Sequence, residues 1–591
     1  MIMEFSRNDF SSRAALATLG VCALPAPPPN APRTVQHAPY IHEILGHAGI
    51  CYSPVAFEDI GERLSGLQLL VTVGERTFEA PFEEQLSQWV RGGGTWISIG
   101  GLCGMGDLLG AAYTPAAYSL WASGLRALGE GFLDARESTH PILADLPLPL
   151  HFFSGIAVTV TTAEVVASVL DAHHRPTGQP AVLARTVGKG ACILLTPDIT
   201  GSVVRIQQGM AVTRDGVPAP DGTGPVTDSV LKTDDGQVLD WLLDREPVPG
   251  VPGLSVFLQP VADQWRGIVL RAIFHAASER NLSLPLLWYY PRDLPALGHI
   301  SHDTDGNKPE QGWLLLQTMR EAQAISTWCV IMPGYAPDII TAIIADGHEL
   351  ATHFDSMTDG CPWGEQYFDV QWRQLSEMFG PDHRPTTNKN HYLRWEGDTE
   401  FFTWCIKRGI TLDQSKGASK TGEAGFNFGT CHPYRPVAPD GTVLPIHELP
   451  TPTQDLRVFA PAEIVPPLLE SVKRQYGILH LLFHPAHIDK PGVADSIKNA
   501  VALGRENGLE WWTGREIADW EDARRKTKWS SMKDGFTLTA EAALAGATLL
   551  CLLPTGASAE ETTTRWGFDF QTVTCDLAGG ETLRITGENK A

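Results

Sequence analysis

The sequence has no long apolar run, no closely spaced cysteine pair and a shortage of positive charge. None of its 591 residues lies in a run approaching the roughly 20 apolar residues of a membrane-spanning helix, so no membrane span is expected. Lysine and arginine number 45 against 68 aspartate and glutamate residues, which gives a net charge of −23. Because this charge would repel nucleic acid, we expect a soluble protein whose substrate is a small molecule or a neutral polymer.

The ten cysteines are scattered without a CxxC motif, which predicts free thiols and not a disulfide framework. Near the start of the chain, Arg7 and Arg13 precede a short apolar run, AALATLGVCALPA, that ends in small residues and resembles a secretory signal. Glu4 and Asp9 interrupt the basic segment that such a signal needs, and a first strand or helix is the alternative. We therefore expect a cytoplasmic protein, with secretion as the open alternative.

A chain of this length needs more than one hydrophobic core, and its rhythm of apolar residues changes along the sequence. Residues 35–248 alternate helix and strand signals and predict a doubly wound, flavodoxin-like α/β domain that follows an N-terminal segment, 1–34. A helical connector is expected over 249–295. Residues 529–591 are rich in threonine and turn residues and predict a small antiparallel, all-β domain.

Residues 296–528 repeat strand and helix about seven times and predict a distorted (β/α) barrel. The expected strands are 297–302, 325–332, 348–354, 409–414, 443–449, 477–483 and 508–512. The expected helices are 310–323, 337–346, 364–379, 398–407, 461–475, 491–506 and 514–526. In such barrels the chemistry lies at the carboxyl ends of the strands, so the residues that follow each strand are the first candidates for a functional site.

Acidic residues follow the first of these strands, and histidines follow several others. Asp303 and Asp305 lie in SHDTDG, where a simple turn into the next helix is the alternative. His353 falls at the end of the strand in GHELATHF, and His391 and His484 follow two further β-prone segments. Each residue alone is ordinary, but together they form a convergent set of oxygen and nitrogen ligands, which suits zinc or another first-row divalent ion.

The order of these motifs resembles the polysaccharide deacetylase family, carbohydrate esterase family four. SHDTDG resembles an HDxD variant of the family's TFDD motif, whose first Asp is a base and whose second binds the metal. GHELATHFDSM resembles the second motif, H-x-x-x-H, through His353, but Met357 stands where the second metal-binding histidine belongs. His484 resembles the family's late histidine at the end of an apolar strand, and the resemblance covers residues 296–528.

The resemblance implies a role for each of these residues. Asp303 would be the base, and Asp305 and His353 would bind the metal, although the roles of the two Asp could be exchanged. His484 would be the acid that protonates the leaving group. We expect His391 to supply the imidazole that the second motif lacks, and we expect the divalent metal ion to be zinc.

Three further residues are predicted to bind substrate: Arg394, Trp395 and His432. A surface arginine, a packed tryptophan and a loop histidine are the alternatives. The expected reaction is hydrolysis of an acyl group, the acetyl group of the family's substrates, from an amide or ester of a carbohydrate. Two alternatives stay open: hydrolysis of a non-carbohydrate amide or other C–N bond, and a degenerate domain that binds glycans without turnover.

The first α/β region offers a rival site. GGTWISIGGLCGMG places Cys103 after a strand and among glycines, as in a nucleophile elbow. The region resembles class I glutamine amidotransferase-like domains, but it lacks the later His-x-Glu pair that commonly activates the thiolate. We therefore expect an inactive domain that shapes the cleft or a homo-oligomer interface, with an amidase that uses Cys103 as the alternative.

Overall fold

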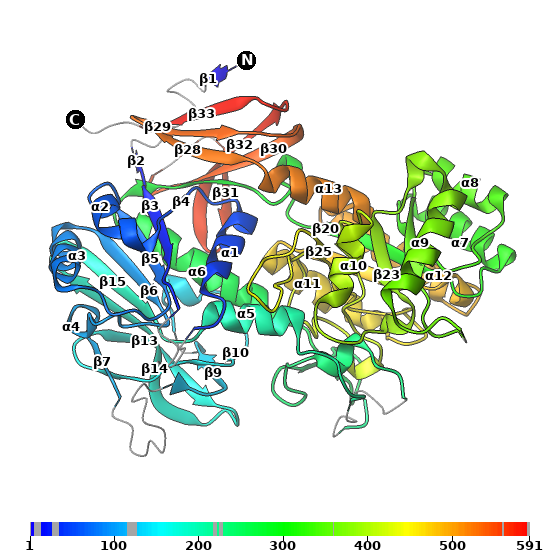
Figure 1. Cartoon of the computed structure of the whole chain (residues 1–591), viewed down its shortest axis with the longest axis horizontal. Coiled ribbons are helices and arrows are strands. Elements are labelled where there is room, and N and C mark those ends of the chain that lie inside the picture. Colours follow the sequence, from blue (N-terminus) through cyan, green and yellow to red (C-terminus); the bar gives the residue numbers. More distant parts are fainter. Residues whose placement is uncertain are drawn as a thin grey trace. The chain divides into compact units, whose positions relative to one another are not determined.

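The computed structural model describes residues 2–4, 14–26, 35–114, 127–136, 138–216, 221–223, 229–358, 360–557, 559 and 561–587. The chain forms two compact units, each assembled from segments that are distant in sequence (Figure 1). The first unit comprises residues 1–203, 264–293 and 522–591, and the second comprises 204–263 and 294–521. Within the described residues, no helix combines the length and the apolar character needed to cross a membrane.

A nine-stranded sheet forms the centre of the first unit. Its strands, in sheet order, are β10 (Leu150–Phe152), β9 (Gly131–Asp134), β13 (Glu164–Asp171), β14 (Pro176–Val187), β15 (Gly190–Leu195), β6 (Thr95–Ile99), β5 (Leu69–Val73), β3 (Leu19–Ala23) and β4 (Ser53–Pro54). The last five are parallel, and the other four extend the sheet with antiparallel pairs.

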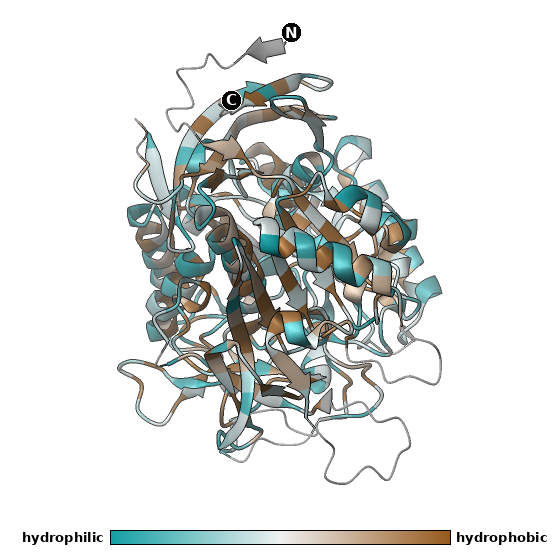
Figure 2. Cartoon of the chain, turned by 90° about the vertical axis from the view of Figure 1, so that its left-hand side faces the viewer, coloured by the Kyte–Doolittle hydropathy of each residue, from teal (hydrophilic) through white to brown (hydrophobic). Residues whose placement is uncertain are grey.

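The sequence of this sheet explains its buried position. Every residue of β5 and β6 is buried, as expected of parallel strands whose two faces are both covered. In Figure 2 the hydrophobic strands of this sheet lie among helices that carry hydrophilic residues on their outer faces. The helices of this region include α1 (Ile41–Ala48) and α3 (Ala80–Gly92). The alternation of strands and helices predicted for this region is seen in β5, α3 and β6, and β14 and β15 form an antiparallel hairpin. The finer flavodoxin-like assignment stays a prediction.

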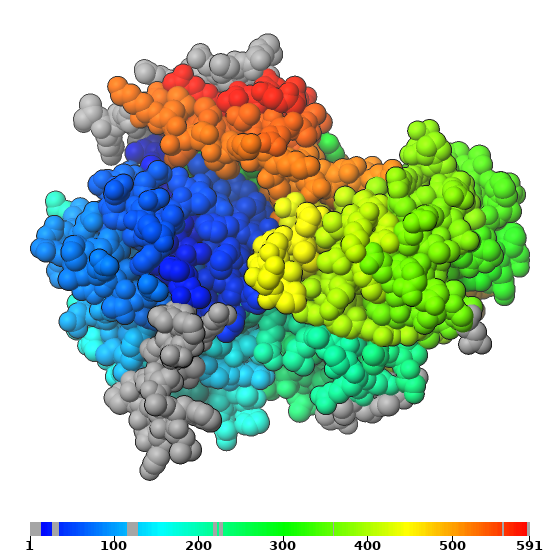
Figure 3. Space-filling model, viewed as in Figure 1, coloured from blue at the N-terminus to red at the C-terminus, as the bar shows by residue number. Residues whose placement is uncertain are grey.

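From Lys528 onward the described elements are all strands, but both of their sheets include strands from elsewhere in the first unit. One sheet joins β28 (Lys528–Met532), β29 (Gly535–Thr539) and β33 (Thr582–Thr586) to β1 (Ile2–Glu4). The other joins β30 (Leu544–Leu552), β31 (Thr562–Arg565) and β32 (Phe568–Leu577) to β19 (Pro285–Leu287). In Figure 3 these residues, orange to red, cover blue residues of the same unit.

The second unit is built on a parallel sheet that curls like half of a barrel. In sheet order the strands are β25 (His447–Glu448), β24 (Leu412–Asp413), β23 (Thr387–Asn390), β22 (Glu349–Phe354), β21 (Thr327–Val330), β20 (Leu297–Asp303) and β26 (Ile478–Phe483), and β27 (Glu510–Trp511) pairs with β20. The helices are α7 (Pro309–Ala322), α8 (Pro337–Ala345), α9 (Glu365–Phe379), α10 (Glu400–Lys407), α11 (Val465–Gln475), α12 (Val493–Glu506) and α13 (Gly514–Arg525).

Each predicted strand and helix of this region has a counterpart in the structure, and β23, whose sequence is TNKN, is the β-prone segment that precedes His391. The described strands form an open order that runs from β25 to β26, with no pairing between these two ends among the described residues. The α/β class is therefore confirmed, and the parallel sheet takes the form of a half-barrel.

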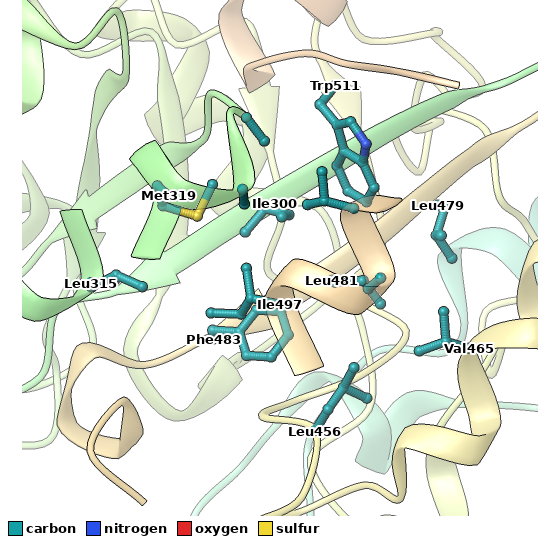
Figure 4. Packing of buried hydrophobic residues seen from close by; sticks show 14 of the residues in the cluster. Ile300, Leu315, Met319, Leu456, Val465, Leu479, Leu481, Phe483, Ile497 and Trp511 are labelled. Carbon is teal, nitrogen blue, oxygen red and sulfur yellow. The ribbon is translucent and has the colours of Figure 1, made fainter. Parts of the chain in front are cut away.

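Alternation along β20 separates an apolar layer from a polar interior. Ile300 points outward into a core with Leu315 and Met319 of α7 and residues of β26 and α12 (Figure 4). His299 and Ser301 point the other way and bond to polar groups: His299 to Gln414, and Ser301 to His480. Asp303 continues this second face, so the pleat carries it to the polar interior at the end of the strand.

Candidate metal centre

Five predicted site residues meet at the carboxyl edge of the half-barrel sheet. Asp303 is the last residue of β20, and Asp305 lies two residues further on. His353 is near the end of β22, His391 directly follows β23, and His484 directly follows β26. Because all the strands are parallel, their carboxyl ends bring these side chains to one edge although up to 181 positions separate them in sequence.

Asp305, His353 and His391 form a close cluster. Asp305 Oδ1 lies 3.3 Å from His353 Nε2 and 3.5 Å from His391 Nε2, and the two rings are 5.2 Å apart between centroids. Their ligand atoms all lie within 4.8 Å of one another, which is close enough to share one metal ion. The placement brings together the three residues predicted as ligands.

The hydrogen bonding of His353 indicates that a cation suits this cluster. Its Nδ1 donates to the backbone carbonyl of Lys389 at 2.9 Å, and a carbonyl can only accept. In the neutral ring, Nε2 is therefore an acceptor, and it faces the Asp305 carboxylate, which is also an acceptor. Both His353 Nε2 and Asp305 Oδ1 are buried without a hydrogen-bond partner. A bound metal ion would satisfy both atoms, so these residues fit the expected group.

A carboxylate orients the second histidine of the cluster. His391 Nδ1 lies 3.0 Å from Asp355 Oδ1, which leaves its Nε2 directed at Asp305. Burial opposes a charge on this ring, but the carboxylates of Asp305 and Asp355 outweigh it and raise the pKa of His391 to about 9. The backbone N–H of Met357 donates to the same Asp355 carboxylate at 2.8 Å. Met357 thus takes part in ordering this carboxylate through its main chain, and the cluster draws its second imidazole from His391.

Asp303 lies deeper than Asp305 and is 3% exposed. Its Oδ2 is 3.9 Å from His353 Nε2 and 4.0 Å from His484 Nε2. Lys389 Nζ, fully buried in the polar interior, lies 3.9 Å from Asp303 Oδ1 and donates to Ser301 at 2.6 Å. A buried ammonium group therefore stands beneath the carboxylate that was predicted as the base.

His484 is held on the opposite side by Asp455, which is fully buried. The His484 ring bonds to Asp455 through Nδ1, and its backbone N–H donates to the same carboxylate at 2.8 Å. Burial opposes a charge on the ring, but the attraction and hydrogen bond of Asp455 prevail and raise the pKa of His484 to about 9. The ring therefore carries a proton at neutral pH, with Nε2 3.9 Å from Asp305 Oδ2.

A cavity of about 470 Å³ opens over these groups. Its aromatic walls are exposed, since Tyr392 is 56% and Phe459 43% accessible. Tyr392 and Leu393 both have left-handed backbone conformations, with φ of 60° and 53°, directly after His391. Two such residues in succession are costly, and strain of this kind is typical of functional sites. The lining residues are Lys232, Asp303, Asp305, His391, Tyr392, Leu393, Ser419, Lys420, Thr421, Gln454, Phe459, His484, Ala486 and His487.

The predicted substrate-binding residues are not among those that line this cavity. The Arg394 guanidinium bonds to Glu396 at 2.6 Å, and Trp395 is fully buried in an aromatic core. His432 is buried and bonds through Nε2 to the Gln475 carbonyl at 2.8 Å. The substrate-binding role of these three residues stays a prediction.

Sequence reasoning missed three residues that contact the histidines and Asp303: Asp355, Lys389 and Asp455. Asp355 follows His353 by two positions, and this spacing was the one signal for it. Lys389 lies in β23, whose polar sequence resembles a loop, and Asp455 lies in the segment TPTQDLR, which carries no recognisable pattern. The fold places all three residues at the site, and no sequence motif marks them.

The elbow at Cys103 in the first unit has a different character. Cys103 has a left-handed backbone, with φ of 54°, and its side chain is fully buried. The Glu75 carboxylate accepts the backbone N–H groups of Leu102 at 2.7 Å and Cys103 at 3.1 Å and also bonds to the Tyr113 hydroxyl. Burial, followed by the nearby Glu75 charge, raises the pKa of the Cys103 thiol far above its ordinary value.

Neither the family models nor the curated proteins contain a match to this chain. Among solved structures, a Mycobacterium smegmatis protein described as a polysaccharide deacetylase is 17% identical, with 41% of this chain and 96% of that chain covered and a TM-score of 0.32. Puue allantoinase is 14% identical, with 40% of this chain and 94% of that chain covered and a TM-score of 0.32. β-Galactosidase from Bacillus circulans sp. alkalophilus is 15% identical, with 32% of this chain and 30% of that chain covered and a TM-score of 0.24. This chain therefore spans under a third of that protein. At these values we infer function from the site geometry alone.

Proposed function

We propose that the second unit is a metal-dependent hydrolase that removes an acyl group, in the first place an acetyl group, from an amide or ester. The observation that carries the proposal is the pair of buried acceptors, Asp305 Oδ1 and His353 Nε2, that face each other at 3.3 Å beside His391. Two imidazoles and one carboxylate are a ligand set that suits zinc and leaves a coordination position open for substrate or water.

In this proposal the remaining groups move protons. The metal, when bound, supplies a Lewis acid for the acyl carbonyl and lowers the pKa of water. Asp303, which is outside the proposed ligand set, accepts the proton of the attacking water. His484 carries a proton at neutral pH and gives it to the departing amine or alkoxide, while Asp455 holds its ring. Lys389 Nζ lies 3.9 Å from Asp303 Oδ1, on the buried side of this carboxylate.

The cavity bears on the class of substrate. A volume of about 470 Å³ lies within the range for small-molecule sites. The exposed rings of Tyr392 and Phe459 offer apolar faces to a sugar ring or another compact group. We therefore propose a small acylated compound as substrate, with an acylated carbohydrate as the first choice and a non-carbohydrate amide as the second.

Metal analysis of the purified protein tests the proposal. We expect about one equivalent of divalent metal, lost in Asp305→Ala and His353→Ala variants and kept in the control His383→Ala, whose ring lies away from the cluster. Acetate release from a panel of acetylated amides and esters should stop after chelation and return with zinc. A metal-free wild-type protein that hydrolyses none of the panel would contradict the proposal and favour glycan binding without turnover.

A further inference from the structure

His487 lines the cavity next to the proposed acid, and the proposed reaction gives it no role. We propose that His487 accepts a hydrogen bond from a hydroxyl group on the carbon next to the acylated nitrogen or oxygen of the substrate. The cavity would therefore select acylated vicinal amino alcohols and diols. The inference deepens the proposed function and rests on it, because it takes the acylated atom to lie at His484.

A short turn places the rings of His484 and His487 side by side. The segment HPAH begins at His484 and forms the 3₁₀ turn η10 (Pro485–His487), in which the His487 N–H donates to the His484 carbonyl at 3.0 Å. Side chains three positions apart are aligned on a 3₁₀ turn, and the two ring centroids are 5.5 Å apart. Gln311 of α7 donates to the Ala486 carbonyl at 3.3 Å, which holds the turn against this helix. Both rings thus border the same cavity.

A buried carboxylate fixes the direction of the His487 ring. The ring Nδ1 lies 3.1 Å from Asp455 Oδ2, and the Phe459 ring packs edge-on against the imidazole with centroids 5.3 Å apart. A carboxylate oxygen only accepts hydrogen bonds, so in the neutral ring the proton lies on Nδ1 and Nε2 is an acceptor. Nε2 points away from Asp455, and no residue that the structure describes forms a hydrogen bond with it. His487 therefore offers an acceptor to the cavity.

The position of this acceptor indicates which substrate group it binds. In the proposed reaction His484 Nε2 gives its proton to the departing nitrogen or oxygen, so that atom lies against the neighbouring ring. A group that reaches His487 must then be attached close by, and a hydroxyl on the adjacent carbon satisfies this condition. The His487 side chain is only 19% exposed, so a substrate that fills the cavity separates its acceptor from water. A substrate without the hydroxyl would leave the acceptor unpaired, which costs binding free energy.

A matched series of substrates tests the inference with the full-length, metal-loaded protein. The series is trans-2-acetamidocyclohexanol, its deoxy analogue N-cyclohexylacetamide, and its fluoro analogue, in which fluorine replaces the hydroxyl group and cannot donate. We expect kcat/KM for the alcohol to exceed both other values about tenfold, the factor that one hydrogen bond to a mostly buried acceptor supplies. Equal kcat/KM values across the series would overturn the inference, while acetate release from all three would leave the proposed function standing.

Substitutions of His487 separate substrate binding from a structural role. A Gln side chain places its amide near the position of Nε2, whereas an Asn side chain places it near Nδ1. We expect His487→Gln to keep most of the preference for the alcohol and His487→Asn to reduce it about tenfold, since only the first retains an acceptor toward the cavity. The intrinsic reactivity of each substrate cancels between variants, and His383→Gln, outside the cavity lining, is the control. A preference that survives in His487→Asn would show that the ring acts only through Asp455 and would overturn the inference.

Binding measurements separate failure of this inference from failure of the proposed function. Titration calorimetry with the three compounds, on the wild type, His487→Gln and His487→Asn, needs no turnover. An alcohol that binds the wild type about tenfold more tightly than its analogues, and loses this advantage in His487→Asn, supports the inference even if no compound is hydrolysed. An alcohol that binds no more tightly than its analogues contradicts it. Melting temperatures show whether each variant is folded, and His487→Phe, which keeps a ring without either nitrogen, replaces His487→Asn if that variant unfolds.

Discussion

The Cys103 elbow and the strand-end cluster place reactive side chains after a strand in two different ways. At Cys103, the backbone has the left-handed conformation of an elbow, but Glu75 already occupies the N–H groups of Leu102 and Cys103. At the half-barrel edge, Asp305 and His353 face each other with no hydrogen-bond partner at the facing atoms. The backbone N–H groups at the elbow already have hydrogen-bond acceptors, whereas the facing atoms of the cluster have no partner and would be satisfied by a bound cation.

The pKa of a key side chain is raised at both places, but with opposite consequences for its chemistry. Burial and a nearby carboxylate raise the pKa of the Cys103 thiol and keep it protonated and inert. A nearby carboxylate likewise raises the pKa of His484, to about 9, but there the proton is what an acid needs. A raised pKa thus disables a nucleophile at Cys103 and suits the acid that we propose at His484, so a perturbed group must be judged by its proposed role and its access to a cavity.

The largest effect should come from the proton-transferring groups of the cluster. We expect Asp303→Asn and His484→Ala each to lower kcat for acyl hydrolysis by about 10²- to 10⁴-fold, because each removes a group that transfers a proton in the reaction. Bound metal, measured by elemental analysis, should stay near the wild-type level, since neither residue belongs to the proposed ligand set. Metal loss in Asp303→Asn would instead show that the two Asp have exchanged roles.

A smaller effect is expected when the partner of His484 is changed. In Asp455→Asn the ring loses the carboxylate that raises its pKa to about 9. The acid must be protonated to act, so activity is lost as pH rises through this pKa, and a lower pKa moves the alkaline limb of the kcat/KM profile to lower pH. We expect a loss of about tenfold at pH 8 and a smaller loss at pH 6, measured against the exposed control Asp489→Asn. An unmoved alkaline limb would exclude Asp455 as a positioning residue.

The sequence allowed prediction of the strand-end residues but not of their supports. Parallel strands end at one edge of their sheet, so a motif such as SHDTDG that directly follows a predicted strand can be assigned to that edge. β23 gave only a weak signal, a short β-prone segment before His391, because its residues fill a polar interior: Asn388 donates to Asp413 at 2.8 Å and Lys389 to Ser301 at 2.6 Å. A strand without an apolar face leaves no periodic signal.

The smallest effect on activity is expected from a substitution of Cys103. This substitution tests whether the active site lies at the Cys103 elbow or at the strand-end cluster. Cys103→Ser should leave acyl hydrolysis within about twofold, because the thiol is fully buried and its raised pKa keeps it protonated. In the native protein at pH 8, iodoacetamide should not label Cys103, as peptide mass spectrometry would show, whereas the unfolded protein should be labelled. Cys192→Ser is the matched control, since that thiol is equally buried in the same unit. If Cys103→Ser lost activity more than tenfold while Cys192→Ser did not, the elbow would be the active nucleophile, and the carboxylate of Glu75 would have to leave the N–H groups of Leu102 and Cys103 during turnover.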